Sequence, residues 1–256
     1  MPTPKPSSLA GRCSIVTGGG RGLGREIARR LALYGACVAV VDVDPAAADD
    51  CARDLARAGA EAIALACDVA DPAAVADAVA AVVARLGPAD VLVNNAALLS
   101  TTPFLHLTHE EWERTLAVDY SGVLHCCREA VPSMVARGFG RVINVASVAA
   151  LRGGGLLGAA AYATAKAGVI GLTRALAHEL AGTGVSVHAV VPGPLATEMT
   201  RALDEDSEAA RRVDSTVPLA RRGSAAEVAA VVGLLAAGLG VAPGEAVVVD
   251  GGVLMR

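Results

Sequence analysis

The sequence has few aromatic residues, no strong excess of one charge and no hydrophobic run long enough to span a membrane. Aromatic residues make up 2% of its 256 residues and charged residues 19%, and the formal net charge is -4. This slight acidity argues against a nucleic-acid-binding protein, which needs a basic surface. The longest clean apolar run, 228–242, has 15 residues, whereas a membrane-spanning helix needs about 20. We therefore expect a soluble, cytoplasmic protein without nucleic-acid or membrane partners.

The sequence also lacks the patterns of a metal site and of a secretion signal. Its six cysteines form no CxxC pair and show no zinc-site spacing, and HEEWE, which begins at His109, does not match HExxH. The N-terminal MPTPKPSSLA alternates prolines and has no apolar core. We predict no metal, a short disordered tail over residues 1–10, and one domain over 11–256 with a substantial core.

Short apolar runs alternate with helical patterns along nearly the whole chain. Seven of these runs are typical of buried strands: CSIVT, ACVAVVD, EAIALACD, DVLVNNA, GRVINVAS, VSVHAVVPG and GEAVVVDGG. Strands without polar alternation indicate a sheet that is covered on both faces and is therefore parallel. A βα barrel also fits the length, but its phosphate-binding glycines follow its last strands rather than its first. The sequence thus predicts an α/β fold, a doubly wound Rossmann-type domain with a seven-stranded parallel sheet flanked by helices.

A glycine-rich segment, TGGGRGLG from Thr17 to Gly24, follows the first predicted strand and leads into a helix. Such a turn brings backbone N–H groups and a helix N-terminus close to a pyrophosphate. Asp42 ends the next strand, where a carboxylate accepts the ribose hydroxyls of NAD and repels the 2′-phosphate of NADP. Arg21, inside the loop, would favour that phosphate. We weigh Asp42 more heavily because its charge faces the ribose while Arg21 stays solvated, so NAD is the predicted cofactor and NADP the alternative.

Tyr162 and Lys166 lie one helical turn apart on the same face of a predicted helix. A tyrosine has a pKa of about 10 in isolation, and a neighbouring lysine cation lowers it toward the range useful for proton transfer. Ser147 ends the preceding strand, where its hydroxyl can hydrogen-bond a substrate oxygen. Together with a dinucleotide site, these three residues form a candidate catalytic group.

With these motifs the sequence resembles the short-chain dehydrogenase/reductase family from about Gly11 to the C-terminus. The glycine motif, Asp68-Val69, NNAA at Asn94, Ser147, YATAK, Pro192-Gly193 with Thr197, and VDGG at Val249 follow the family order. The resemblance implies hydride transfer between a nicotinamide and a carbonyl or alcohol carbon. Tyr162 would be the acid or base, Ser147 the orienting hydroxyl, and Lys166 the residue that holds the ribose and tunes Tyr162.

The resemblance also implies the remaining site residues. Besides Tyr162 and Lys166, the expected cofactor-binding residues are Gly18, Gly20, Arg21, Gly22, Leu23, Gly24, Asp42, Asp68, Val69, Asn94, Ala96, Ala97, Pro192, Gly193, Leu195 and Thr197, with Val190 beside the nicotinamide. The expected substrate pocket consists of Ala149, Leu151, Leu156, Leu157, Leu195 and Met199, under a lid at about 194–218. Because these residues are apolar or small, we expect an apolar secondary alcohol or ketone.

Asp119, in LAVDYSG, departs from the family pattern, because relatives usually carry an Asn that holds a water next to the catalytic lysine. We count Asp119 among the catalytic candidates. Its charge should stabilise the Lys166 cation and partly offset the effect of that cation on Tyr162. The sequence departs also at Ala97, where NNAA replaces NNAG, and in the long glycine-rich stretch LRGGGLLGAAA between Ser147 and Tyr162.

The helical segment 165–180 is apolar around most of its circumference, and the C-terminal VVVDGGVLMR is apolar as well. A helix that packs only on its own sheet needs one apolar stripe, so we expect a homotetramer, with a dimer next. Two other functions stay open. One is an NADPH-dependent 3-ketoacyl-carrier-protein reductase, which Asp42 opposes. The other is a non-catalytic dinucleotide-binding regulator, which Asp119 supports and the intact Ser147, Tyr162 and Lys166 oppose.

Overall fold

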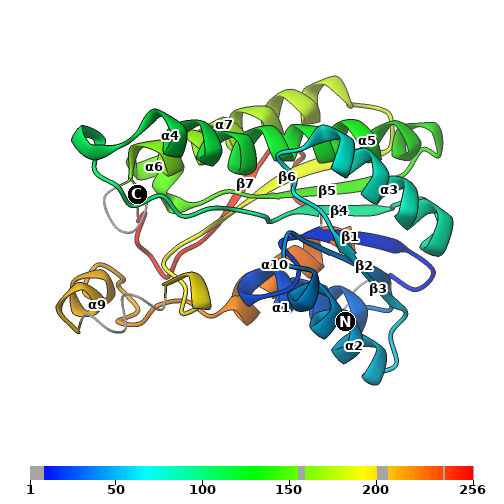
Figure 1. Cartoon of the computed structure of the whole chain (residues 1–256), viewed down its shortest axis with the longest axis horizontal. Helices are drawn as coiled ribbons and strands as arrows, with labels where there is room; N and C mark the ends of the chain where they lie inside the picture. Colours follow the sequence, from blue (N-terminus) through cyan, green and yellow to red (C-terminus); the bar gives the residue numbers. More distant parts are fainter. Residues whose placement is uncertain (1–8, 155–158, 201–206, 239, 256) are drawn as a thin grey trace.

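The computed structural model describes residues 9–154, 159–200, 207–238 and 240–255. Within them seven strands form one parallel sheet in the order β3-β2-β1-β4-β5-β6-β7 (Figure 1). The strands are β1 (Cys13–Thr17), β2 (Cys37–Asp42), β3 (Ala62–Ala66), β4 (Val91–Asn94), β5 (Gly140–Val145), β6 (Val185–Pro192) and β7 (Ala246–Val249). The predicted doubly wound α/β fold is confirmed, and each of the seven apolar runs contains one strand.

Helices cover both faces of the sheet (Figure 1). One hydrophobic cluster joins the sheet to α3, α5 and α7, and a second joins it to α1, α2 and α10. The helices are α1 (Gly22–Leu33), α2 (Pro45–Arg57), α3 (Pro72–Leu86), α4 (His109–Leu116), α5 (Gly122–Ala136), α6 (Val148–Arg152), α7 (Ala160–Glu179), α9 (Ser207–Asp214) and α10 (Ala225–Ala236). Shorter turns are η1 (Phe104–His106), the π-helical η2 (Ala117–Ser121) and η3 (Glu198–Thr200). The described helices include none that is long and apolar enough to cross a membrane.

Side chains at the strand ends start the helices that follow. Asp44 caps α2 and Asp71 caps α3, and in both cases a proline occupies the first helical position. Ser147 caps α6 through Ala149 N. All strands run in parallel, so these caps gather at one edge of the sheet. Chain order reverses between β1 and β4, and a ligand binds outside such a reversal in open α/β sheets.

The prediction of a disordered tail over residues 1–10 does not hold at Leu9, and residues 1–8 lie outside the described residues. Leu9 is 2% exposed and packs in the cluster around α1, and its N–H donates to Tyr34 O. The apolar side chain of Leu9 is therefore part of the core, although the prolines before it suggested a uniform tail over 1–10. Of the predicted lid, the described residues contain η3 and α9, while 201–206 lie outside them.

Candidate active site

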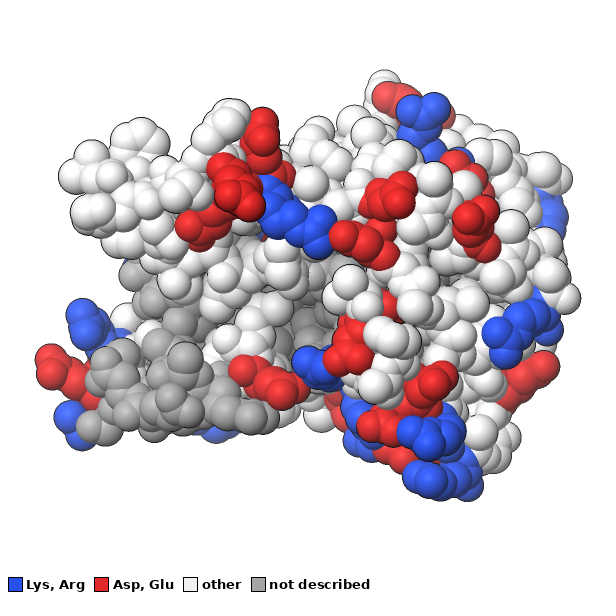
Figure 2. All heavy atoms as spheres, in the orientation of Figure 1, with Lys and Arg blue, Asp and Glu red and all other residues white. Residues whose placement is uncertain are grey.

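A cavity of about 560 Å³ opens at the carboxyl edge of the sheet. In Figure 2 the surface is hollowed between the part that carries α4 and α6 and the part that carries α9. Most of the predicted site residues line this cavity: Gly18, Arg21, Gly22, Leu23, Gly24, Asp42, Asp68, Val69, Ala96, Ala97, Ser147, Ala149, Tyr162, Lys166, Pro192, Gly193, Leu195, Thr197 and Met199. Residues far apart in the sequence thus meet in one continuous space.

The glycine loop approaches its neighbours too closely for side chains. A Cβ on Gly24 would lie 1.9 Å from Gly18 O, and one on Gly18, whose φ is +59°, would lie 2.9 Å from Ala96 Cα. Helix α1 follows directly and has no side-chain cap, which leaves first-turn N–H groups to bind an anion. Backbone N–H groups of this loop and of the first turn of α1 lie next to the cavity and suit the pyrophosphate of a dinucleotide.

The Asp42 carboxylate is held by two backbone N–H groups at the cavity wall. Gly20 N donates to its Oδ2 at 2.9 Å, and Asp44 N donates to its Oδ1 at 3.0 Å. Arg21, which we expected to be solvated, is 56% exposed, but its guanidinium forms an ion pair with Asp44. The Arg21 side chain thus pairs with the carboxylate of Asp44 and not with that of Asp42.

Asp68 and Val69 line the cavity after β3, and Arg114 from α4 joins them. Arg114 Nη2 lies 2.8 Å from Asp68 Oδ2. Partial burial acts to raise the pKa of Asp68, but hydrogen bonds from Ala70 N and Arg114 outweigh it and the pKa falls. Sequence reasoning missed Arg114, because nothing local to α4 indicates its contact with a residue at the end of β3.

Asn94 was expected in the cofactor site and does not line the cavity. It is 3% exposed and its amide donates to Asn144 Oδ1 at 2.8 Å, because strand residues alternate between the two faces of the sheet. Asn95, its neighbour, lines the cavity instead and donates to Thr17 O and Gly18 O at 3.0 Å. Of the two asparagines in this motif, Asn95 thus lines the cavity and Asn94 does not, and the cofactor-binding role expected for Asn94 stays a prediction.

Three more expected site residues lie away from the cavity wall. Gly20 packs against the start of α2, Val190 is fully buried in the core beside the sheet, and Leu151 is 37% exposed on α6. Each lies next to residues that do line the cavity, and their expected roles in the site stay predictions. The expected pocket residues Leu156 and Leu157 lie outside the described residues.

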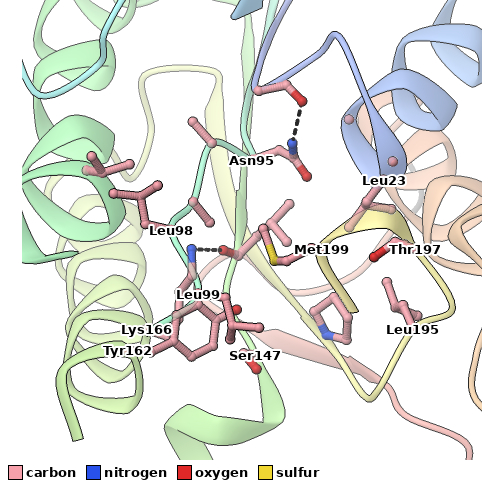
Figure 3. A pocket seen from close by; sticks show the side chains of 18 of the residues that line it. Leu23, Asn95, Leu98, Leu99, Ser147, Tyr162, Lys166, Leu195, Thr197 and Met199 are labelled. Carbon is pink, nitrogen blue, oxygen red and sulfur yellow. Dashed lines mark hydrogen bonds between the residues drawn. The ribbon is translucent and has the colours of Figure 1, made fainter. Parts of the chain in front are cut away.

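Ser147, Tyr162 and Lys166 converge where β5 and α7 meet (Figure 3). Tyr162 is 9% exposed and Lys166 1%. Lys166 Nζ donates to Val145 O at 3.2 Å and lies 5.7 Å from the centre of the Tyr162 ring. The one-turn spacing read from the sequence therefore places the ammonium beside the phenol, and Leu98 and Leu99 line the cavity with them.

Asp119 lies behind this group, on the π-helical turn η2, and is fully buried. Its Oδ2 is 3.3 Å from Lys166 Nζ, and its Oδ1 accepts a hydrogen bond from Leu98 N at 2.7 Å. Burial raises the pKa of Asp119 despite the nearby Lys166 cation. The expected proximity of Asp119 and Lys166 is therefore present as a buried ion pair.

The pKa of Tyr162 is raised rather than lowered. Burial is the largest cause, and the Asp119 carboxylate acts in the same direction. Lys166 and a hydrogen bond with Ser147 lower the pKa but do not outweigh burial. The sequence pattern identified the effect of Lys166 correctly and could not include desolvation, which depends on the packed surroundings.

Comparison with known proteins agrees with this geometry. Residues 12–208 match the family model for short chain dehydrogenases. The chain is 36% identical to 3-oxoacyl-[acyl-carrier-protein] reductase FabG of Escherichia coli over 97% of this chain and 99% of that protein. It is 38% identical to 2-dehydro-3-deoxy-L-rhamnonate dehydrogenase (NAD(+)) of a Sphingomonas species, over 89% of this chain and 88% of that one.

A solved structure shares the fold over nearly the whole length. It is that of a protein assigned as an NAD(P)-dependent gluconate 5-dehydrogenase from Beutenbergia cavernae, with NADP bound at low occupancy. The TM-score is 0.91 at 35% identity, over 98% of this chain and all of that one. The family model, the relatives and the shared fold agree, and this chain belongs to the short-chain dehydrogenase/reductase family of oxidoreductases.

Proposed function

We propose that the protein is an NAD-dependent oxidoreductase that transfers a hydride between the nicotinamide and a secondary alcohol or ketone. One observation carries the proposal. A single cavity has the Asp42 carboxylate in one part of its wall and Ser147, Tyr162 and Lys166 in another. The first feature suits an unphosphorylated ribose, and the second suits proton transfer to or from a carbonyl or alcohol oxygen.

The residues that would hold the cofactor follow from their places along the cavity. The bare N–H groups at the start of α1 would bind the pyrophosphate, Asp42 the adenosine ribose, and Asp68 and Val69 the adenine. Pro192, Gly193, Leu195 and Thr197, after β6, would enclose the nicotinamide end. When it is bound, the nicotinamide would accept or donate the hydride.

The proton transfer falls to this chain's own side chains. Tyr162 takes the hydroxyl proton when an alcohol is oxidised and returns it when a ketone is reduced, while Ser147 hydrogen-bonds the same oxygen. Lys166 favours the phenolate and is held by Val145 O and Asp119. The apolar side chains of Leu98, Leu99, Ala149, Leu195 and Met199 line the same cavity and favour an apolar substrate.

The test measures the reduction of NAD, and separately of NADP, by a panel of apolar secondary alcohols, with Tyr162→Phe beside the native chain. We expect NAD-dependent turnover that falls by about 10²–10⁴-fold in Tyr162→Phe, the usual contribution of general acid–base catalysis. A preference for NADP would contradict the cofactor assignment. Turnover that persists in Tyr162→Phe would contradict the role of Tyr162.

A second candidate is 3-ketoacyl-carrier-protein reduction with NADPH, which the 36% identity to the Escherichia coli reductase favours. The Asp42 carboxylate opposes a phosphorylated ribose. Reduction of a 3-ketoacyl thioester by NADPH at a higher kcat/KM than any NAD-dependent reaction would decide for this candidate. NAD binding without turnover on either panel would decide for the non-catalytic regulator.

A further inference from the structure

The loop that carries Arg21 is tied to the turn between β2 and α2 by several contacts. Gly20 N and Asp44 N donate to opposite oxygens of Asp42, and the Arg21 guanidinium pairs with Asp44 Oδ2. A Cβ on Gly20 would lie 2.7 Å from the Cβ of Ala47, so the loop touches the first turn of α2. The two acids and the arginine therefore have defined places at the adenosine end of the cavity.

Asp44 is fixed independently of Arg21. As the N-cap of α2, it accepts hydrogen bonds at Oδ1 from Ala46 N and Ala47 N, at 3.0 and 3.2 Å. This leaves Oδ2 for the arginine. An exposed ion pair is weak when two long side chains must both be ordered to form it. Here one partner is already ordered by the helix cap, so only the Arg21 side chain loses freedom.

Arg21 lines the cavity, as does Asp42. It is the cation of the glycine loop, and a free guanidinium there would attract the 2′-phosphate of NADP. Paired with Asp44, that charge is neutralised, and Asp42 and Asp44 together leave a net charge of one negative unit on the three side chains. A dianionic phosphate meets repulsion in this arrangement, whereas a ribose with two free hydroxyls does not.

We propose that Asp44 is a specificity-determining residue, which holds Arg21 in an ion pair and so prevents it from binding a 2′-phosphate. The inference rests on the proposed preference for NAD, and it gives that preference a second cause besides the charge of Asp42. The adenosine site then disfavours a phosphorylated ribose for two reasons. Asp42 repels the phosphate, and Asp44 forms an ion pair with the Arg21 guanidinium that would otherwise bind the phosphate.

The test is Asp44→Asn, which removes the charge and keeps an oxygen that caps α2. Isothermal titration calorimetry with NAD, NADP and adenosine 2′,5′-bisphosphate measures binding without turnover. We expect affinity for NADP and for the bisphosphate to rise roughly tenfold, through loss of the ion pair and of one nearby negative charge. Affinity for NAD should change less than about twofold, because Asp42 is retained.

Two further variants isolate the cause. The first adds Asp44→Asn to Arg21→Ala. There, Asp44→Asn should raise the affinity for NADP by less than about a third of the rise that it gives in the native chain, because no cation remains to be released. Asp71→Asn is the matched control, because Asp71 also caps a helix that begins with Pro-Ala-Ala and does not line the cavity. It should leave all three affinities unchanged, and its thermal unfolding beside that of Asp44→Asn reports on folding.

The proposal is overturned if Asp44→Asn leaves NADP affinity unchanged in a folded protein, or if the full gain survives in Arg21→Ala. An equal loss for NAD and NADP overturns it as well, since that would assign Asp44 a purely structural role. The proposed NAD preference is judged separately, by the ratio of NAD to NADP affinity in the native chain. The role of Asp44 is judged by the change in that ratio.

Discussion

At the scale of single residues, the unusual feature is a carboxylate buried against Lys166. Asp119 is fully buried, 3.3 Å from Lys166 Nζ, and its charge helps to raise the pKa of Tyr162. Removal of the Asp119 charge should therefore change the pKa of Tyr162. The pKa of Tyr162 reflects the combined effects of burial, the Lys166 cation, the Asp119 carboxylate and the hydrogen bond with Ser147.

Asp119→Asn should shift the pH dependence of alcohol oxidation to lower pH. The carboxylate raises the pKa of Tyr162, so its removal lowers that pKa. Oxidation needs the phenolate as base, so activity is present above the pKa and lost as the pH falls through it. The pH profile of kcat/KM measures the shift, with Asp77→Asn on an exposed part of α3 as control. An unchanged profile would remove Asp119 from the proton path.

Gly24→Ala should weaken cofactor binding. The added Cβ would lie 1.9 Å from Gly18 O, so the loop has to move away from its place beside the cavity. We expect the Kd for NAD to rise by roughly tenfold or more, the scale of an overpacking penalty. In the control Gly171→Ala, the added Cβ meets nothing within 4 Å. Equal affinities in the two variants would contradict the role of the loop.

At the scale of secondary structure elements, side-chain caps fix where helices begin. Helix α10 starts with a capping box, in which Ser224 and Glu227 satisfy each other's backbone N–H groups. Arg221 lies 2.6 Å from Glu227, and its hydrogen bond is the largest cause that lowers the pKa of Glu227 to about 2. The sequence analysis identified neither the Asp-Pro caps of α2 and α3 nor the contact of Arg221 with Glu227 in the first turn of α10.

Glu227→Gln should reduce stability only where Glu227 is ionised. The folded-state pKa is depressed to about 2 from an ordinary 4.5, so ionised Glu227 stabilises the fold above about pH 4.5, and this contribution is lost as the pH falls through about 2. Urea unfolding at several pH values measures it. The difference from the native chain should be largest near neutrality and disappear in acid, while Glu61→Gln, at an exposed glutamate, serves as control. A difference independent of pH would refute the electrostatic origin.

At the scale of the whole molecule, apolar side chains are exposed on α7 and β7 among the residues that the structure describes. On α7, Ala167 and Ala175 are exposed about two helical turns apart, and Val248 on β7 is 42% exposed. Small side chains let a second helix approach closely. These surfaces support the expected homotetramer, which stays a prediction.

Light scattering coupled to gel filtration should give about 102 kDa, four times the 25.5 kDa of one chain. Ala167→Arg should reduce this mass, because a charged side chain on the exposed face of α7 blocks close packing. Ala56→Arg, on the exposed side of α2, should leave it unchanged. A native mass of one chain would reject assembly through these surfaces.

Local sequence patterns were enough to predict the seven strands, their parallel sheet, the glycine loop and the group Ser147, Tyr162 and Lys166. These features depend on residues close together in the chain, whose periodicity and spacing dictate local structure. Three features emerge only in the folded chain: Asn95 rather than Asn94 lines the cavity, Arg21 pairs with Asp44 across 23 residues, and burial raises the pKa of Tyr162. Strand orientation, contacts between distant segments and desolvation arise only when the chain packs, so no local pattern contains them.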